Sequence, residues 1–461
     1  MKKGEIMFEA AKRTPITFTE VTLRDGEQQK IKEVTIEDRI AVFDSLVETG
    51  IQVFEIGHLG NKGRDERFAG DQAFASALIK HIQEREEVDS KYNQVKLQVL
   101  FGSQKGIMEG ALESLEGFDK DRVIIHVYDR LHEPLRDLAS TPYTAHESAQ
   151  RVCEAADIAI GHGYKNFSIS GEGATGSSLD EAFDFYSSVA EHLSEQEVDS
   201  INVNLANTYG LPPEGDWGAE GLRLFNDAIK EKVPGATTSV HAHNDDRSSI
   251  EFSIAAVKAG FDTIEGTLFG MGERSGNTAL CDAMIRLLEI ARAEVAGSKR
   301  SKGILRLGSV SARQAVFEER FVPEPIIENL THWYNSSSEI ASIYGTEERL
   351  EATSLGDPNA YKAGSGPHDH ASAKALEDPA RHPLWRSYLS IAVVHAALGR
   401  PEAEGILQAD PETIRSITID GSAGGGATTR IVNGEIQGID SREKAIADAQ
   451  LAISEALGRA A

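Results

Sequence analysis

Between residues 15 and 295, short apolar runs rich in β-branched residues alternate with longer segments whose apolar residues recur at helical spacing. Three of the longer segments, at 36–50, 144–163 and 248–260, end in glycine, the usual stop of a helix. The short runs predict strands at 16–23, 53–59, 95–101, 122–128, 166–172, 201–207, 237–244 and 263–269.

Eight strand–helix units within about 280 residues predict the α/β class and, within it, a (β/α)8 TIM barrel. A doubly wound open sheet is the alternative. It is disfavoured because the first strand is not followed by the glycine-rich phosphate turn that such sheets carry.

The barrel periodicity ends near residue 295, where a basic segment and then two closely spaced prolines interrupt the pattern. We therefore expect smaller α/β subdomains after the barrel. The predicted regions are a barrel catalytic domain at 1–295, a helical linker at 296–345, a subdomain with a Gly/His-rich loop at 346–400, and a small terminal subdomain at 401–461.

The composition is that of a soluble globular enzyme, with 40% hydrophobic and 26% charged residues among 461. A net charge of -26 repels nucleic acid and anionic membranes, so neither is an expected partner. The two cysteines, Cys153 and Cys281, are expected to be buried free thiols. Without a secretory signal or an apolar run long enough to span a bilayer, we expect a cytoplasmic protein.

Polar residues at the predicted strand ends are the candidates for chemistry, because TIM-barrel active sites lie at the C-terminal ends of the strands. Arg24 and Asp25 follow the first strand, and His241 and His243 end the seventh on one face. Two imidazoles and a carboxylate predict a site for Zn²⁺, Mn²⁺ or Mg²⁺. Read alone, Asp25 is equally a helix N-cap, and an isolated His-x-His pair is more often structural than metal-binding.

A second His-x-His pair, His368 and His370, lies in a Gly/Pro-rich loop outside the barrel. On its own this pair is typical of solvated polar residues.

Three ordered motifs resemble the Claisen-condensing branch of the metal-dependent (DRE-type) lyase and acyltransferase barrels: LRDGEQ at 23–28, HAHND at 241–245 and EGTLFGMGERSGN at 265–277. That branch contains the 2-isopropylmalate, homocitrate, citramalate and Re-type citrate synthases. Further segments resemble the 2-isopropylmalate synthases in particular: VIIHVY at 123–128, SISGEGATG at 168–176, VNLANT at 203–208, SGPHDHASAK at 365–374 and LWRSYL at 384–389.

The resemblance implies an acyltransferase that joins acetyl-CoA to a metal-bound 2-oxo acid and hydrolyses the thioester, as in leucine biosynthesis. It implies Asp25, His241, His243 and Asn277 as metal ligands, Arg24, Glu172, His368 and Tyr388 as catalytic residues, and His126, Ser170, Asn204 and Thr208 as substrate-binding residues. His58, which lies where the chain departs from the family pattern, is a further candidate for substrate binding. In the family a partner subunit lays the loop bearing the histidine and tyrosine over the barrel mouth, so a homodimer is implied.

The implied chemistry needs a base, and His368 oriented by Glu172 is the expected one, because imidazole titrates near working pH. Arg24 would stabilise charge that develops on the carbonyl oxygen, and Thr208 would bind the oxo-acid carboxylate. Tyr388 would polarise the thioester.

The chain departs from the family pattern in several places. Glu20 replaces the aspartate before LRDG, His58 follows the second strand where Gly-Phe-Pro is usual, and Asn207 introduces a polar side chain into VNLANT. The substrate therefore stays open between a branched apolar 2-oxo acid and a more polar one, as in homocitrate, citramalate, Re-citrate or phosphonomethylmalate synthases. A carbon–carbon lyase or aldolase on the same barrel is the alternative reaction, and a non-catalytic assembly protein the alternative class.

Overall fold

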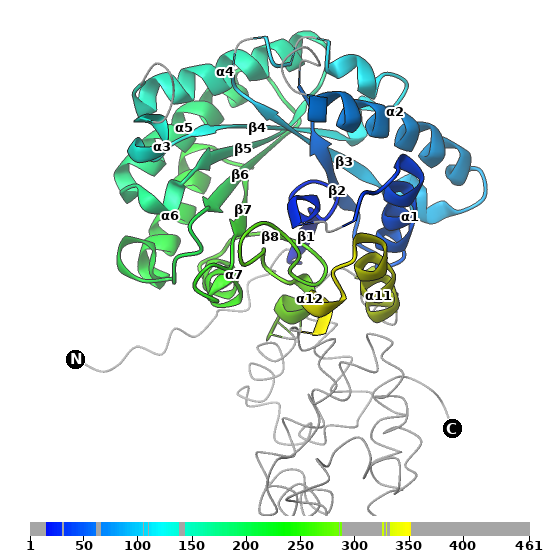
Figure 1. Ribbon diagram of the computed structural model, residues 1–461. Coiled ribbons are helices and arrows are strands. Elements are labelled where there is room, and N and C mark those ends of the chain that lie inside the picture. Colours follow the sequence, from blue (N-terminus) through cyan, green and yellow to red (C-terminus); the bar gives the residue numbers. More distant parts are fainter. Residues whose placement is uncertain are drawn as a thin grey trace, which may run out of the picture.

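The computed structural model describes residues 15–29, 32–60, 66–104, 106–108, 110–137, 143–284, 286–287, 325–326, 329 and 332–351. Within them eight parallel strands close into a barrel in which each strand pairs with the next and the last pairs with the first. Figure 1 shows this barrel. The strands are β1 (Thr17–Glu20), β2 (Val53–His58), β3 (Lys96–Gly102), β4 (Val123–Arg130), β5 (Asn166–Glu172), β6 (Ser200–Asn207), β7 (Thr237–Ala242) and β8 (Thr263–Gly266). The predicted TIM barrel is confirmed.

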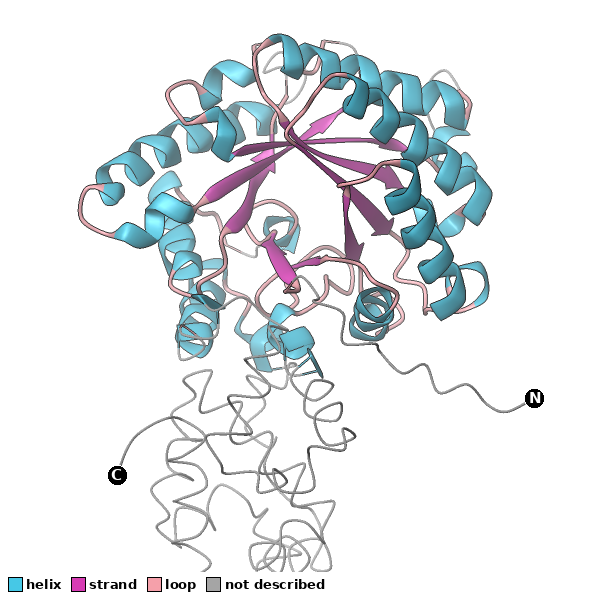
Figure 2. Ribbon diagram, turned by 180° about the vertical axis from the view of Figure 1, so that it is seen from behind, coloured by secondary structure: helices cyan, strands magenta, loops and turns pink. Residues whose placement is uncertain are grey.

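Helices surround the strands on the outside (Figure 2). They are α1 (Ile36–Val47), α2 (Glu66–Glu86), α3 (Glu133–Asp137), α4 (Ala145–Gly161), α5 (Leu179–Glu195), α6 (Ala219–Lys232) and α7 (Ser249–Lys258). The three helices predicted from glycine-terminated segments are confirmed as α1, α4 and α7. The connection between β3 and β4 differs from the eightfold pattern, because its described part contains only the 3-10 turns Leu112–Leu115 and Lys120–Arg122.

The strands place apolar side chains outward, against the helices, and polar side chains inward. On β3, Leu97, Val99 and Phe101 belong to the hydrophobic core, whereas Gln98 reaches Glu55 and Glu265 across the interior. Many TIM barrels fill the interior with bulky branched residues instead. Here the apolar layer between strands and helices stabilises the fold, and the interior is a hydrogen-bonded polar network.

The first strand is shorter than the predicted 16–23 and ends at Glu20. The chain turns there because the Val21 carbonyl accepts the backbone N–H groups of Arg24, Asp25 and Gly26 at 2.8–3.1 Å. The Glu20 carboxylate holds the turn by accepting from Thr22 and from the backbone of Leu268. Arg24 and Asp25 are therefore presented by a tight turn rather than by the strand itself.

Two further helices, α11 (His332–Tyr344) and α12 (Glu347–Glu351), come from the chain that follows the barrel. Fully buried Trp333 donates its indole N–H to the Thr49 carbonyl beyond one end of α1, and the Tyr344 hydroxyl donates to Glu27 near the other. The helix α11 thus runs antiparallel to α1, beside it in Figure 1. The domain boundaries predicted at 295, 345 and 400 stay predictions.

Both cysteines are free, Cys281 buried and Cys153 half-buried, and burial raises the pKa of the Cys153 thiol to about 12. None of the helices in the described ranges is long and apolar enough to cross a membrane.

The buried Glu20 carboxyl leads to a pH-dependent stability. Burial raises its pKa from 4.5 to about 7, against the hydrogen bonds from Thr22 and Leu268. The folded state therefore holds the proton more tightly than the unfolded chain, and this stabilisation, on the order of 3 kcal/mol, is present below pH 4.5 and lost as the pH rises through 7. The free energy of unfolding, measured with urea at several pH values, should fall less steeply between pH 5 and 8 for Glu20→Gln than for the wild type.

Glu113→Gln, at an exposed position of a 3-10 turn, is the control and should leave the wild-type pH dependence unchanged. Parallel pH dependences for Glu20→Gln and the wild type would contradict the assignment.

Candidate functional site

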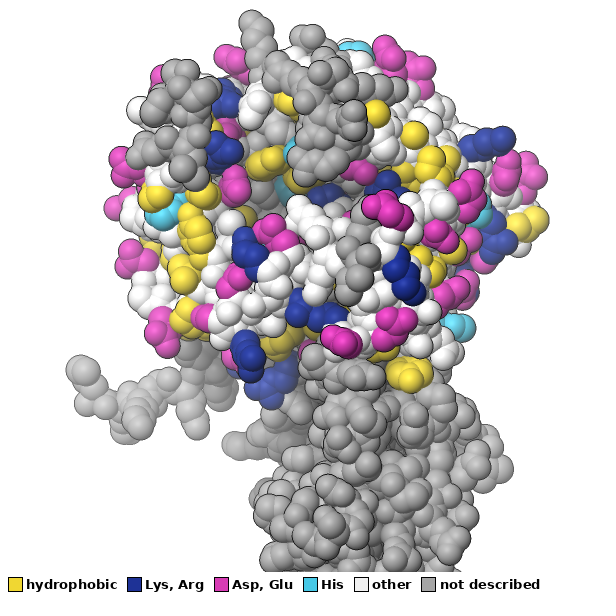
Figure 3. Space-filling model, in the orientation of Figure 1, with side chains coloured by type: hydrophobic (Ala, Val, Ile, Leu, Met, Phe, Trp, Pro, Cys, Tyr) yellow, Lys and Arg dark blue, Asp and Glu magenta, His cyan; other side chains and the backbone are white. Residues whose placement is uncertain are grey.

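A cavity of about 560 Å³ opens at the C-terminal ends of the barrel strands. Figure 3 shows histidine and basic side chains together on this face of the molecule. The structure brings most of the predicted site residues to the cavity wall: Arg24, Asp25, His58, His126, Ser170, Glu172, Asn204, Thr208, His241 and His243.

Asp25, His241 and His243 form a buried group in which one ligand atom from each residue lies within 4.8 Å of the others. The two imidazole Nε2 atoms lie 3.2 Å and 3.9 Å from Asp25 Oδ2. This oxygen is buried and has no hydrogen-bond partner among the residues that the structure describes. One carboxylate oxygen and two imidazole nitrogens converging in this way fit a divalent cation.

The electrostatics around this group also fit a cation. Burial would raise the pKa of Asp25, but the charge of Arg24 and the contact with His241 hold it well below its usual range. Burial would likewise lower the pKa of His241, but the nearby carboxylates of Asp25 and Glu265 raise it to about 9. Burial lowers the pKa of His243 to about 4. The site therefore contains an ionised carboxylate at Asp25 and a neutral imidazole at His243. The surrounding carboxylates favour a positive charge at His241.

Arg24 lies between two carboxylates. Its Nη1 is 2.8 Å from Asp25 Oδ1, and its Nε donates to Glu55 Oε1. Glu55 is fully buried on β2, and Gln98 Nε2 on β3 donates to it at 2.6 Å and to Glu265 at 3.2 Å. Three buried carboxylates, Asp25, Glu55 and Glu265, thus share this interior with one guanidinium, and a divalent cation would offset the excess negative charge.

Glu55, Gln98 and Glu265 were not among the residues predicted for the site. Each is a polar residue in an otherwise apolar strand, which is the signal that could have identified them. At an inward position of a closed barrel, such a residue must find polar partners across the interior.

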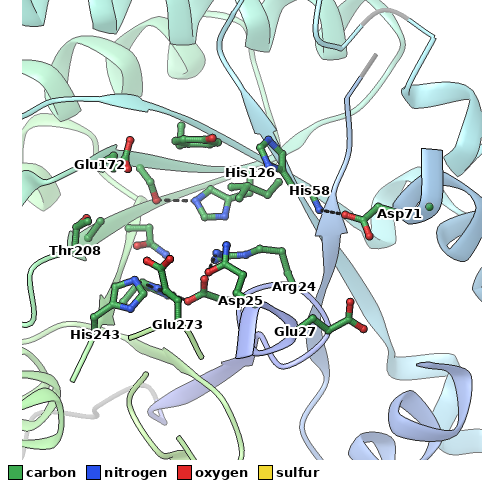
Figure 4. Close-up of a pocket in the computed structure, with 18 of the residues that line it drawn as sticks. Arg24, Asp25, Glu27, His58, Asp71, His126, Glu172, Thr208, His243 and Glu273 are labelled. Carbon is green, nitrogen blue, oxygen red and sulfur yellow. Dashed lines mark hydrogen bonds and ion pairs between the residues drawn. The ribbon is translucent and has the colours of Figure 1, made fainter. Parts of the chain in front are cut away.

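His126 and Ser170 form a hydrogen-bonded pair on neighbouring strands. His126 Nε2 lies 2.7 Å from Ser170 Oγ, and His126 Nδ1 lies 2.6 Å from Glu55 Oε2. Figure 4 shows His126 above Arg24 and Asp25, with its ring directed into the cavity. All three members of this chain are buried, so their orientations are set by one another.

Asn204 and Thr208 present polar groups to the cavity from β6 and the loop after it. Asn204 is fully buried, and neither of its amide atoms has a hydrogen-bond partner in the described part of the chain. The Thr208 hydroxyl oxygen accepts from the backbone N–H of Gly173 at 2.9 Å, which leaves its own proton for a ligand. Both residues therefore have a hydrogen-bond donor that no described residue uses.

Glu172 ends β5 at the cavity rim, where burial raises the pKa of its carboxyl against the charge of Arg130, whose Nε lies 3.7 Å away. Asn277 pairs with His243 in an isolated β-bridge and donates to the Met271 carbonyl at 3.1 Å, while its Oδ1 is buried without a partner among described residues. Its role as a ligand stays a prediction.

The two polar departures from the family pattern have different positions. His58 lines the cavity, and its ring packs edge-on against Tyr128 at a centroid distance of 5.6 Å. In Figure 4 it lies on the wall away from His243. Asn207 instead bonds Thr175 and both backbone groups of Leu211, so it holds its own loop together. Of these two residues, only His58 lines the cavity. His368, His370 and Tyr388 lie outside the described residues.

The HMGL-like family profile matches residues 15–304. Curated 2-isopropylmalate synthases are 25% identical over 420 residues in Rhizobium johnstonii and 26% identical over 424 in Agrobacterium fabrum. These alignments cover 85% and 86% of this chain but only 64% and 66% of the relatives, so the chain spans less than two-thirds of their length.

Among solved structures, HMG-CoA lyases of Bacillus subtilis and Pseudomonas aeruginosa superpose with a TM-score of 0.50 at 17% identity. The superpositions cover 73% and 72% of this chain, and 95% and 94% of the lyases. At this identity the likeness shows the fold alone.

The buried group of Asp25, His241 and His243 predicts a measurable metal affinity. Titration of the purified protein with Mn²⁺, followed by electron paramagnetic resonance, should show one tight site. Asp25→Asn removes the charged ligand and should weaken binding by more than the roughly 10–100-fold that follows loss of an outer-shell partner. Asp227→Asn, exposed on α6, is the matched control and should bind Mn²⁺ like the wild type. Equal affinity in Asp25→Asn and the wild type would exclude this carboxylate as a ligand.

Proposed function

The chain belongs to the HMGL-like family, and from this premise we propose that it is an acyl-CoA:2-oxo acid acyltransferase resembling 2-isopropylmalate synthase. The proposed reaction joins the methyl carbon of acetyl-CoA to the carbonyl carbon of a 2-oxo acid and then hydrolyses the thioester, giving a 2-alkylmalate and CoA. The observation that carries the proposal is the convergence in one cavity of a buried group suited to a metal ion, an arginine, an unpartnered asparagine and a threonine hydroxyl that can still donate.

The cavity residues suit an oxo acid with its carboxylate and carbonyl side by side. Asp25, His241 and His243 would hold the divalent cation, which when bound supplies a Lewis acid and a template for the oxo acid. Asn204 and Thr208 would donate to the oxo-acid carboxylate, because each has a donor directed to the cavity and no competing acceptor among described residues. Substrate would thus be held from two sides.

Arg24 would stabilise negative charge at the carbonyl oxygen as the new bond forms. Its charge is permanent, because burial, which disfavours the charged form, is outweighed by Asp25 and Glu55 and its pKa stays above the ordinary range. Groups of this kind contribute through fixed orientation in a dry site. We further propose that His368, oriented by Glu172, removes the methyl proton of acetyl-CoA, and that Tyr388 polarises the thioester carbonyl.

The expected activity is release of CoA from acetyl-CoA in the presence of Mn²⁺ or Mg²⁺ and a 2-oxo acid, measured with a thiol reagent. The oxo acids tested should include 2-oxoisovalerate, oxaloacetate and 2-oxoglutarate, since His58 leaves both apolar and acidic substrates open. Arg24→Lys keeps the charge but not the planar geometry, and we expect it to lower kcat by about 100–1,000-fold.

Arg223→Lys, at an exposed position on α6, is the control for replacing an arginine by lysine and should be fully active. Absence of CoA release with every oxo acid would reject the proposal. Cleavage of a hydroxyacyl-CoA without condensation would replace it with the lyase reaction.

We propose a homodimer in which the loop bearing His368 completes the barrel of the partner. Mixing inactive Asp25→Asn protein with inactive His368→Ala protein tests this arrangement, because only a mixed dimer with crossing loops contains one intact site. After subunit exchange we expect about a quarter of wild-type activity. Each variant protein on its own, taken through the same subunit-exchange procedure, serves as a control and should stay inactive. No recovery in a mixture shown to form mixed dimers would mean that the loop serves its own barrel.

A further inference from the structure

Glu55 occupies an inward position in the middle of β2, below the cavity, and its side chain is fully buried. Both carboxylate oxygens are used: Oε1 accepts from Arg24 Nε, and Oε2 accepts from Gln98 Nε2 and His126 Nδ1, each at 2.6 Å. Burying a carboxylate is costly even when it is paired, and an apolar residue at such a position is often no less stabilising. Stability alone therefore does not account for a buried carboxylate at this position.

The first consequence of these contacts is the direction of the Arg24 guanidinium. Glu55 holds Nε, and Asp25 holds Nη1 at 2.8 Å. The remaining nitrogen, Nη2, makes no hydrogen bond to any residue that the structure describes, although Arg24 lines the cavity. With two sides of the planar group fixed, the remaining nitrogen is free to bind a ligand in the cavity that Arg24 lines.

The second consequence is the proton arrangement of His126. Because an ionised carboxylate only accepts hydrogen bonds, Nδ1 must be the donor in its 2.6 Å contact with Glu55. The ring is thereby held with Nε2 toward Ser170 Oγ, 2.7 Å away at the cavity wall. Rotation of the ring or transfer of the proton to the other nitrogen would break one of these two contacts.

We propose that Glu55 is a positioning residue for the reaction, because one buried carboxylate orients both Arg24 and the His126–Ser170 pair toward the substrate. This inference rests on the proposed function, since it concerns how the same cavity holds the 2-oxo acid. Glu55 does not contact the substrate itself. It acts by keeping three groups on three different elements in one arrangement before the substrate binds.

Glu265 provides a matched comparison within the same interior. It is also fully buried and accepts from Gln98, but its other contact is with the imidazole of His241, 3.5 Å away. Glu265 therefore bears on the metal-binding group, whereas Glu55 bears on Arg24 and His126. The same substitution at the two positions should have different effects.

Glu55→Gln and Glu265→Gln are compared by Mn²⁺ affinity and by kcat and KM for the oxo acid. We expect Glu55→Gln to lower kcat/KM by about 10–100-fold, the range for loss of an outer-shell contact, with Mn²⁺ affinity within threefold of the wild type. Glu265→Gln should weaken Mn²⁺ binding instead. Combined with Ser170→Ala, Glu55→Gln should cost less than the two single effects multiplied, because both act on one hydrogen-bonded chain.

An NMR measurement tests the same inference without any turnover. In protein labelled with ¹⁵N-histidine, the Nδ1 proton of His126 should give a downfield signal that is absent from His126→Asn and shifted or lost in Glu55→Gln, but kept in Glu265→Gln. Glu55→Asp retains the charge with a shorter reach, so it should fold if Glu55→Gln does not, and should still alter the signal.

An unchanged signal in the Glu55 variants, or unchanged kcat/KM in Glu55→Gln, would overturn the inference. If the wild type releases no CoA with any oxo acid, the proposed function fails. The NMR result and the Mn²⁺ affinities would still decide whether Glu55 orients His126 independently of the metal site.

Discussion

The constraint on which the site depends is the enclosure of unequal charge in the mouth of the barrel. Asp25, Glu55 and Glu265 are buried there with the guanidinium of Arg24 between two of them. Carboxylates taken out of water must be paired, hydrogen-bonded or bound to a cation. The described side chains meet this need in part, through Gln98, His126 and His241. The remaining excess of negative charge makes the cavity suited to a divalent cation.

The fold tolerates these buried carboxylates because its stability comes from the apolar layer between strands and helices. The outward faces of the strands and the inward faces of the helices form one continuous hydrophobic layer around the barrel. The interior can then be devoted to hydrogen bonds that specify orientation instead of to packing. In such an interior each polar side chain depends on its neighbours for hydrogen bonds. A substitution on one strand therefore alters the hydrogen bonding of side chains on the next strand.

Much of the fold could be predicted from residue pattern alone, since strand–helix alternation with glycine stops is a local signal. The site was predictable where chemistry falls at strand ends, as for Asp25, His241 and His243. The early end of β1 was not, because it depends on a contact between Glu20 and the distant backbone of Leu268. Glu55 was missed for a similar reason: its partners lie on β3, on β4 and in the turn after β1, and only closure of the barrel brings them together.

The position of α12 has a consequence for the chain beyond it. Its Arg349 bonds the Gly270 carbonyl in the loop after β8, so the chain leaves the described region at the rim of the cavity. His368 lies 17 positions after Glu351 in the sequence (368 − 351), and a fully extended chain of this length reaches at most roughly 60 Å. Because α11 and α12 anchor the chain beside the barrel, this length is the upper limit on how far position 368 can lie from the loop after β8.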